Sequence, residues 1–210
     1  DFVILYDNSD SIKPTDRNEL DGFVNDVIEL ISNDDKDNRI ALVSFSDVAE
    51  VRVPLTNETK QIREFLKESS RDPQSSRHRN TARGLYVANK EVYAQLPVDP
   101  LRLRITLLLT NGGPSTCNQY SNFTIAPELA AERPQLKKCF EAELTATRKE
   151  MTETHKAEIY VVFAGELSEY DKKMLEYVHQ DIDHLMYADM IEDLRYDVSE
   201  QLQKKNKQIC

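Results

Sequence analysis

The sequence predicts a single α/β domain, residues 1–210, in which helices cover both faces of a mainly parallel sheet. Short, continuously apolar segments alternate along the chain with longer amphipathic segments. The short segments are typical of buried strands, and the long ones are typical of helices. Their alternation indicates parallel strands joined by helical crossovers. A length of 210 residues and a hydrophobic content of 40% are enough for one sizeable core.

Six apolar segments are predicted to be strands. The run Phe-Val-Ile-Leu-Tyr begins the chain, and the segment that precedes Thr110 is the most hydrophobic of all. One short segment directly follows its predecessor, so we expect these two to pair in an antiparallel manner at one edge. In chain order the predicted strands are residues 2–6, 39–45, 50–55 (the short edge strand), 103–109, 158–164 and 184–187.

Six amphipathic segments between these strands are predicted to be helices. The first has its apolar residues on one stripe, and Thr59 and Ser168 are typical caps of two others. Two connections are long: a polar loop at residues 69–80 and an insertion at residues 111–132 that contains several Pro and Gly. The predicted helices are residues 14–32, 59–68, 82–95, 135–152, 168–179 and 188–205.

Composition excludes several classes of function. The formal net charge is −10, whereas a nucleic-acid-binding face needs clustered Lys and Arg. No apolar run approaches the ~20 residues that cross a bilayer, so direct membrane insertion is not expected. The chain starts inside its first strand and has no signal peptide. We therefore expect a domain excised from a longer protein.

The cysteines and glycosylation sequons indicate an oxidising, extracellular setting. Cys117 and Cys139 flank one loop and could close it as a disulfide, while Cys210 would pair elsewhere. No spacing typical of a zinc site is present. Asn57-Glu58-Thr59 and Asn122-Phe123-Thr124 are sequons in polar connections, so Asn57 and Asn122 are candidate glycosylation sites.

The turn after the first strand carries the strongest chemical signal. Its sequence, Asp7-Asn8-Ser9-Asp10-Ser11, places a carboxylate and two hydroxyls at alternate positions. Hard divalent cations prefer such oxygen ligands, and ligands of open α/β sheets bind beyond the carboxyl ends of strands. The alternative is a capped turn, because Asp, Asn and Ser favour loops and helix starts without any metal.

Three motifs in order resemble the von Willebrand factor type A domain family. They are Asp7-x-Ser9-x-Ser11, residues 38–46 (NRIALVSFS) and residues 107–112 (LLLTNG), and the resemblance covers essentially the whole chain. It implies a Rossmann-like, doubly wound sheet with a metal-ion-dependent adhesion site. There Mg²⁺ or Mn²⁺ accepts a carboxylate from a protein ligand. Asp7, Ser9 and Ser11 correspond to the first group of metal ligands.

The chain departs from the family pattern at three positions. Asn111 stands where the family has a second aspartate, so its amide oxygen would ligate without charge. Arg79 aligns with a ligating threonine; arginine cannot ligate, and Thr81, two residues later, is the alternative ligand. Asp10 replaces a usual glycine and either restores a carboxylate or faces solvent. The predicted site is therefore degenerate, with Asp10, Arg79 and Gly112 as ligand-facing residues.

The resemblance implies a non-enzymatic extracellular adhesion module whose partner is a matrix protein such as collagen or a cell-surface receptor. One alternative is a structural domain that has lost metal binding and recognises matrix or an acidic partner. It would use a helical side or the basic cluster of Arg71, Arg77, His78, Arg79 and Arg83. A second alternative is an intracellular Mg²⁺-dependent assembly module.

Catalysis is not expected. No general base lies near Ser9 or Ser11 in the sequence, and the four histidines do not have the spacing of metal ligands.

Overall fold

The structure is a computed structural model that describes residues 1–34, 37–69, 78–97, 99, 102–116, 134–179 and 181–209. Its centre is a six-stranded sheet in the order β3-β2-β1-β4-β5-β6. Only the β2–β3 pair is antiparallel, which confirms the predicted antiparallel edge strand. This strand was predicted to be short, but it has 8 residues, because its pairing with β2 continues across register shifts. The strands are β1 (Phe2–Asp7), β2 (Ile40–Phe45), β3 (Ala49–Thr56), β4 (Arg104–Thr110), β5 (Ala157–Phe163) and β6 (Leu185–Tyr187).

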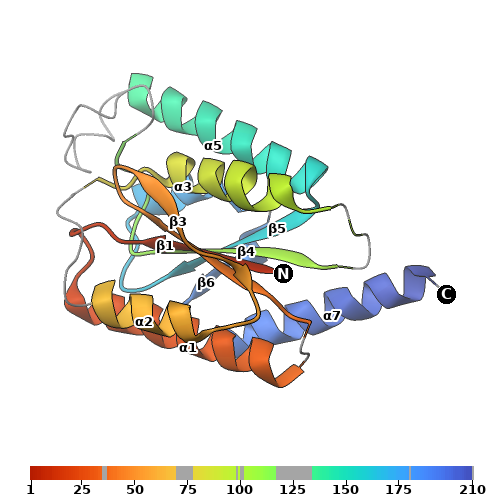
Figure 1. Ribbon diagram of the computed structural model, residues 1–210. Coiled ribbons are helices and arrows are strands. Elements are labelled where there is room, and N and C mark those ends of the chain that lie inside the picture. Colours follow the sequence, from red (N-terminus) through yellow and green to blue (C-terminus); the bar gives the residue numbers. More distant parts are fainter. Residues whose placement is uncertain are drawn as a thin grey trace.

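Helices cover both faces of this sheet (Figure 1). One face packs against α3 and α5, and α6 contributes Met174 and Leu175 to the same apolar cluster. The other packs against α1, α2 and α7. The predicted α/β class with a mainly parallel sheet is thus confirmed. The helices are α1 (Pro14–Asp34), α2 (Lys60–Ser69), α3 (Thr81–Val87), α5 (Pro134–Thr154), α6 (Glu169–Leu175) and α7 (Ile191–Ile209).

The helix predicted at residues 82–95 is in fact broken. It consists of α3, a π-helical segment (Ala88–Val92) and a short 3₁₀ turn (Tyr93–Gln95). Val87 and Val92 both enter the same apolar cluster. Residues five apart lie on different sides of an α-helix, whereas the wider π turn brings them onto one side. The π turn thus lets Val87 and Val92 pack into the same cluster.

The central strands are buried on both faces, and this fixes where their ends lie. Every residue of β1, β2 and β4 is buried. In the parallel register Tyr6 of β1 lies beside Leu109 of β4 and Ser44 of β2. The segments that follow β1 and β4, which carry the predicted ligand residues, therefore emerge side by side at the carboxyl edge of the sheet.

Candidate functional site

Asp7 is the buried anchor of the carboxyl edge. Its side chain is fully buried at the end of β1. Carboxylate atom Oδ2 accepts a hydrogen bond from Thr110 Oγ1 of β4 at 2.7 Å, and Oδ1 accepts one from the Ser9 backbone N–H at 3.0 Å. Asp7 thus ties the end of the neighbouring strand to the turn that follows its own strand.

The turn itself is held from below by helix α1. Arg17, which is buried, donates from Nη1 to Asn8 Oδ1 at 3.1 Å and from Nη2 to the Ser9 carbonyl at 3.0 Å. The hydroxyls of Ser9 and Ser11 are hydrogen-bonded to each other at 2.7 Å. Ser9 is buried, whereas Asp10 and Ser11 are exposed. The base of the turn is thus held by hydrogen bonds to buried groups, and its tip is open to solvent.

Asn111 lies at the end of β4, across the gap from this turn. Its Nδ2 donates to Asp16 Oδ2 at 3.2 Å and to the Ser11 carbonyl at 3.4 Å. Its Oδ1 accepts a hydrogen bond from Arg79 Nη1 at 2.9 Å. The structure therefore brings Asn111, Ser11 and Arg79 together.

Arg79 is buried beside Asn111, with 6% of its surface exposed. Its backbone is fixed by Ser115, since Arg79 N–H donates to Ser115 Oγ at 2.8 Å and Ser115 N–H donates back to the Arg79 carbonyl at 3.0 Å. The guanidinium lies against Gly112, where an added Cβ would be 2.2 Å from Nη1. Within the described part of the chain, Nε has no hydrogen-bond partner.

The remaining predicted site residues lie in different surroundings. Thr81 is fully buried at the start of α3, and its hydroxyl has no hydrogen-bond partner among the described residues. Asp10 is at the exposed tip of the turn, and Gly112 is buried beneath Arg79.

The basic cluster is not one surface: Arg79 faces inward, whereas Arg83 is exposed and lies over the Tyr86 ring. Arg71 and Arg77 lie outside the described residues.

Four residues of the site were not predicted from the sequence. They are Asp16 and Arg17 in the first turn of α1, Thr110 at the end of β4, and Ser115. Asp16 and Arg17 are 9% and 6% exposed although they begin a helix that follows a polar turn. The one sequence signal was the motif around Thr110, which places a hydroxyl on the strand opposite Asp7.

Most of the predicted ligand oxygens at this edge are already engaged by the protein. Both Asp7 oxygens, the two serine hydroxyls and Asn111 Oδ1 are hydrogen-bonded within the chain, and Thr81 Oγ1 is the one predicted ligand atom without a partner among the described residues. A metal held by Asn111 Oδ1, at a bond length of about 2.1 Å, would lie within about 5 Å of Arg79 Nη1. At an effective dielectric constant of about 20, repulsion between a divalent ion and a guanidinium at that distance is about 7 kcal/mol. The donor set present therefore does not fit the metal that the family pattern implies.

Carboxylate and imidazole side chains offer no substitute site. Among the residues that the structure describes, no group of three or more His, Cys, Asp or Glu side chains is placed to hold a metal. Asp16 accepts a hydrogen bond from Asn111 Nδ2. The Asp16 carboxylate also packs against Gly165, where an added Cβ would be 3.1 Å from Asp16 Oδ2.

Comparison with known proteins identifies the family. The sequence profile of the von Willebrand factor type A domain matches residues 1–138. The chain belongs to this family. Domains of the family are typically non-catalytic modules that bind proteins. No curated protein sequence matches the chain.

Solved structures with the same fold come from diverse proteins. Proximal thread matrix protein 1 from the mussel byssus, described with a zinc-occupied MIDAS motif, has a TM-score of 0.59 at 16% identity, covering 89% of this chain and 43% of that one. Manganese-loaded Plasmodium vivax TRAP protein has a TM-score of 0.64 at 13% sequence identity, and the match covers 91% of this chain and 68% of that one. An aerotolerance-related membrane protein from Bacteroides fragilis has a TM-score of 0.60 at 10% sequence identity, and the match covers 97% of this chain and 98% of that one. This chain thus spans less than half of the mussel protein. At these identities the likeness extends to the fold alone.

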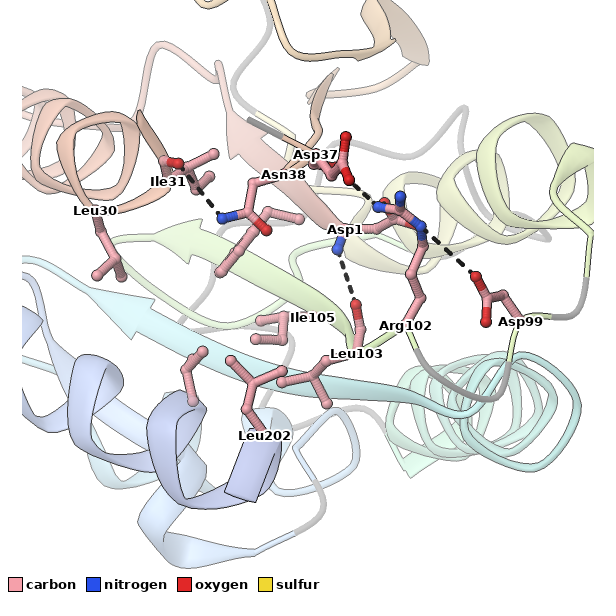
Figure 2. Close-up of a pocket in the computed structure, with 12 residues that line it drawn as sticks. Asp1, Leu30, Ile31, Asp37, Asn38, Asp99, Arg102, Leu103, Ile105 and Leu202 are labelled. Carbon is pink, nitrogen blue, oxygen red and sulfur yellow. Dashed lines mark hydrogen bonds and ion pairs between the residues drawn. The ribbon is translucent and has the colours of Figure 1, made fainter. Parts of the chain in front are cut away.

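A hollow lies at the opposite, amino edge of the sheet. It has a volume of about 290 Å³, and none of the predicted site residues lines it. Figure 2 shows its polar groups engaged with one another: the Asp1 ammonium donates to the Leu103 carbonyl, and Arg102 reaches Asp37 and Asp99. The Asp1–Leu103 and Arg102–Asp37 contacts join segments distant in sequence, so we interpret this hollow as part of the scaffold.

The predicted covalent modifications remain predictions. Cys139 is buried on α5, while Cys117 and Cys210 lie outside the described residues. Asn57 is exposed in the turn after β3, as glycosylation would require, and Asn122 lies outside the described residues. In the described part of the chain, no helix is long and apolar enough to cross a membrane.

Proposed function

We propose that this domain is a non-enzymatic protein-binding module whose ligand surface is the carboxyl edge of the sheet, around Ser11 and Asn111. One observation carries the proposal: the turn is fixed from beneath by buried groups, Asp7 and Arg17, while its tip remains exposed. A rigid polar tip on a buried scaffold suits recognition, because little flexibility is lost on binding. The Ser9 hydroxyl bonds to the Ser11 hydroxyl rather than to a base, which argues against nucleophilic catalysis.

The partner proposed is an extracellular protein, either a matrix component such as collagen or a cell-surface receptor. The two sequons and the paired spacing of Cys117 and Cys139 support an extracellular setting. The mussel byssus protein and the Plasmodium vivax TRAP protein supply precedents for the fold only. Of the two alternatives, the module without metal is favoured by the Arg79–Asn111 contact, and the intracellular Mg²⁺-dependent module is not.

The extracellular assignment predicts a disulfide between Cys117 and Cys139. Closing this loop would stabilise the fold by about 3 kcal/mol through restriction of the unfolded chain. Mass spectrometry of peptides prepared without reduction is expected to detect the cross-linked pair in protein from its native source. Alkylation of both cysteines without prior reduction would contradict the extracellular assignment and favour the intracellular alternative.

Blocking the exposed tip is expected to weaken partner binding. The variant Ser11→Trp places a bulky ring on the tip, and we expect at least about tenfold weaker binding to immobilised collagen or to receptor-bearing cells, about 1.4 kcal/mol. Ser199→Trp is the matched control, because Ser199 is exposed on α7, next to Val198, which lines a hollow at the opposite edge of the sheet. Surface plasmon resonance and cell-binding assays measure both variants. Equal binding by the two variants would place the ligand surface elsewhere.

A further inference from the structure

We propose that Arg79 is the resident cation of this edge, so that the domain engages its partner without a divalent metal ion. This inference rests on the proposed function, but its test does not require the partner. The guanidinium would supply, beside Asn111, the positive charge that the family pattern assigns to a divalent cation. Binding at the edge would then be independent of the concentration of Mg²⁺ or Mn²⁺.

The buried charges that contact the turn, Thr110 or Asn111 balance without a metal, while Asp10 of the same turn is exposed. Four buried charged side chains hydrogen-bond to the turn, to Thr110 or to Asn111, and they are two carboxylates and two guanidiniums: Asp7, Asp16, Arg17 and Arg79. A divalent cation is held in proteins by an excess of negative or neutral oxygen ligands. Here the second guanidinium cancels that excess. Asn111, which stands where the family pattern has an aspartate, fits this balance of charges. Its amide oxygen accepts a hydrogen bond from the Arg79 guanidinium without adding a negative charge.

The position of Arg79 is built into the fold rather than accidental. Ser115 fixes its backbone by two hydrogen bonds, and Gly112 leaves space for its guanidinium. Long charged side chains are almost never buried unless a specific environment holds them. Arg79 is buried although its Nε has no partner in the described part of the chain. An incompletely paired buried cation is costly for stability, which points to a role in the site.

Paramagnetic broadening by Mn²⁺ tests the inference without any partner. In ¹H–¹⁵N spectra of the wild-type chain, we expect the amide signals of Ser9, Ser11 and Asn111 to be unaffected by millimolar Mn²⁺. The double variant Arg79→Thr/Asn111→Asp removes the guanidinium and restores the carboxylate. Its Ser9 and Ser11 signals are expected to broaden beyond detection and to recover when excess Mg²⁺ is added, because both ions compete for the same oxygens.

The matched control is Arg83→Thr/Asn111→Asp. This control also replaces one arginine by threonine and Asn111 by aspartate, but it keeps Arg79. Arg83 is a suitable arginine to replace because it is exposed on α3. In this control Arg79 is expected to pair with the new carboxylate at position 111. The amide signals of Ser9 and Ser11 are therefore expected to stay sharp when Mn²⁺ is added. Broadening in the wild type or the control that excess Mg²⁺ reverses would overturn the inference. A folded double variant that ignores Mn²⁺ would also overturn it, because something other than Arg79 would then exclude the metal.

The outcome is separable from that of the proposed function. If the double variant does not fold, the wild-type and control spectra still decide whether this edge takes a metal. If Ser11→Trp leaves partner binding intact, the ligand surface is wrong, yet the Mn²⁺ result stands. Where a partner is bound, its affinity for the wild type is expected to be the same in EDTA and in millimolar Mg²⁺.

Discussion

Replacing Asp7 with alanine is expected to lower the free energy of unfolding by about 3 kcal/mol, a large part of the total stability of a domain of this size. The carboxylate is fully buried and accepts hydrogen bonds from Thr110 Oγ1 and the Ser9 N–H. Without it, a buried hydroxyl and a buried N–H lose their acceptor, and two buried arginines face a single aspartate.

The measurement for Asp7→Ala is urea unfolding followed by circular dichroism, because the chain contains no tryptophan for fluorescence. Asp10→Ala is the control: Asp10 lies three positions away in the same turn but is exposed, so its loss is expected to change stability by less than about 0.5 kcal/mol. Similar values for the two variants would mean that Asp7 does not anchor the edge. Partner binding is expected to fall with Asp7→Ala even where the variant remains folded, since the turn loses its register.

The fold could be predicted from the sequence because its central strands are buried on both faces. Residues 2–6 of β1, which pack between helices on the two faces of the sheet, are an unbroken hydrophobic run, and such runs are easily recognised. The antiparallel edge strand was also predictable, since it follows β2 with only a brief connection, but its length of 8 residues was not. The broken helix after Thr81 was not, because one amphipathic stripe is compatible with either an α or a π turn until the packing partner is known.

The site was only partly predictable, for a related reason. Asp7, Ser9 and Ser11 are located by the end of one strand, which is a local signal. The contact between Arg79 and Asn111 joins residues 32 apart in sequence, and an arginine in a polar, basic segment is normally expected to face solvent. Only the structure shows that it turns inward over Gly112. Asp16 and Arg17 were missed likewise, since polar residues in a first helical turn are usually explained as caps.

Gly112→Ala is expected to destabilise the domain by about 2 kcal/mol, because one methyl group would overpack a filled space. The added Cβ would lie 2.2 Å from Arg79 Nη1 and 2.8 Å from Cζ, so the guanidinium must leave its place beside Asn111. Gly22→Ala is the matched control. Gly22 lies within α1 with nothing within 4 Å of an added Cβ, so there the same change is expected to stabilise by about 0.5 to 1 kcal/mol.

The decisive comparison for Gly112→Ala is a double-mutant cycle with Arg79→Ser, measured by the same urea unfolding. If the clash with the guanidinium is the cause, alanine at position 112 costs little once Arg79 is shortened, and the coupling energy approaches the full effect of the single variant. An undiminished loss in the Arg79→Ser background would instead mean that Gly112 is required by the backbone. The cycle therefore measures directly how firmly the fold holds Arg79 in place, which is what a resident cation requires.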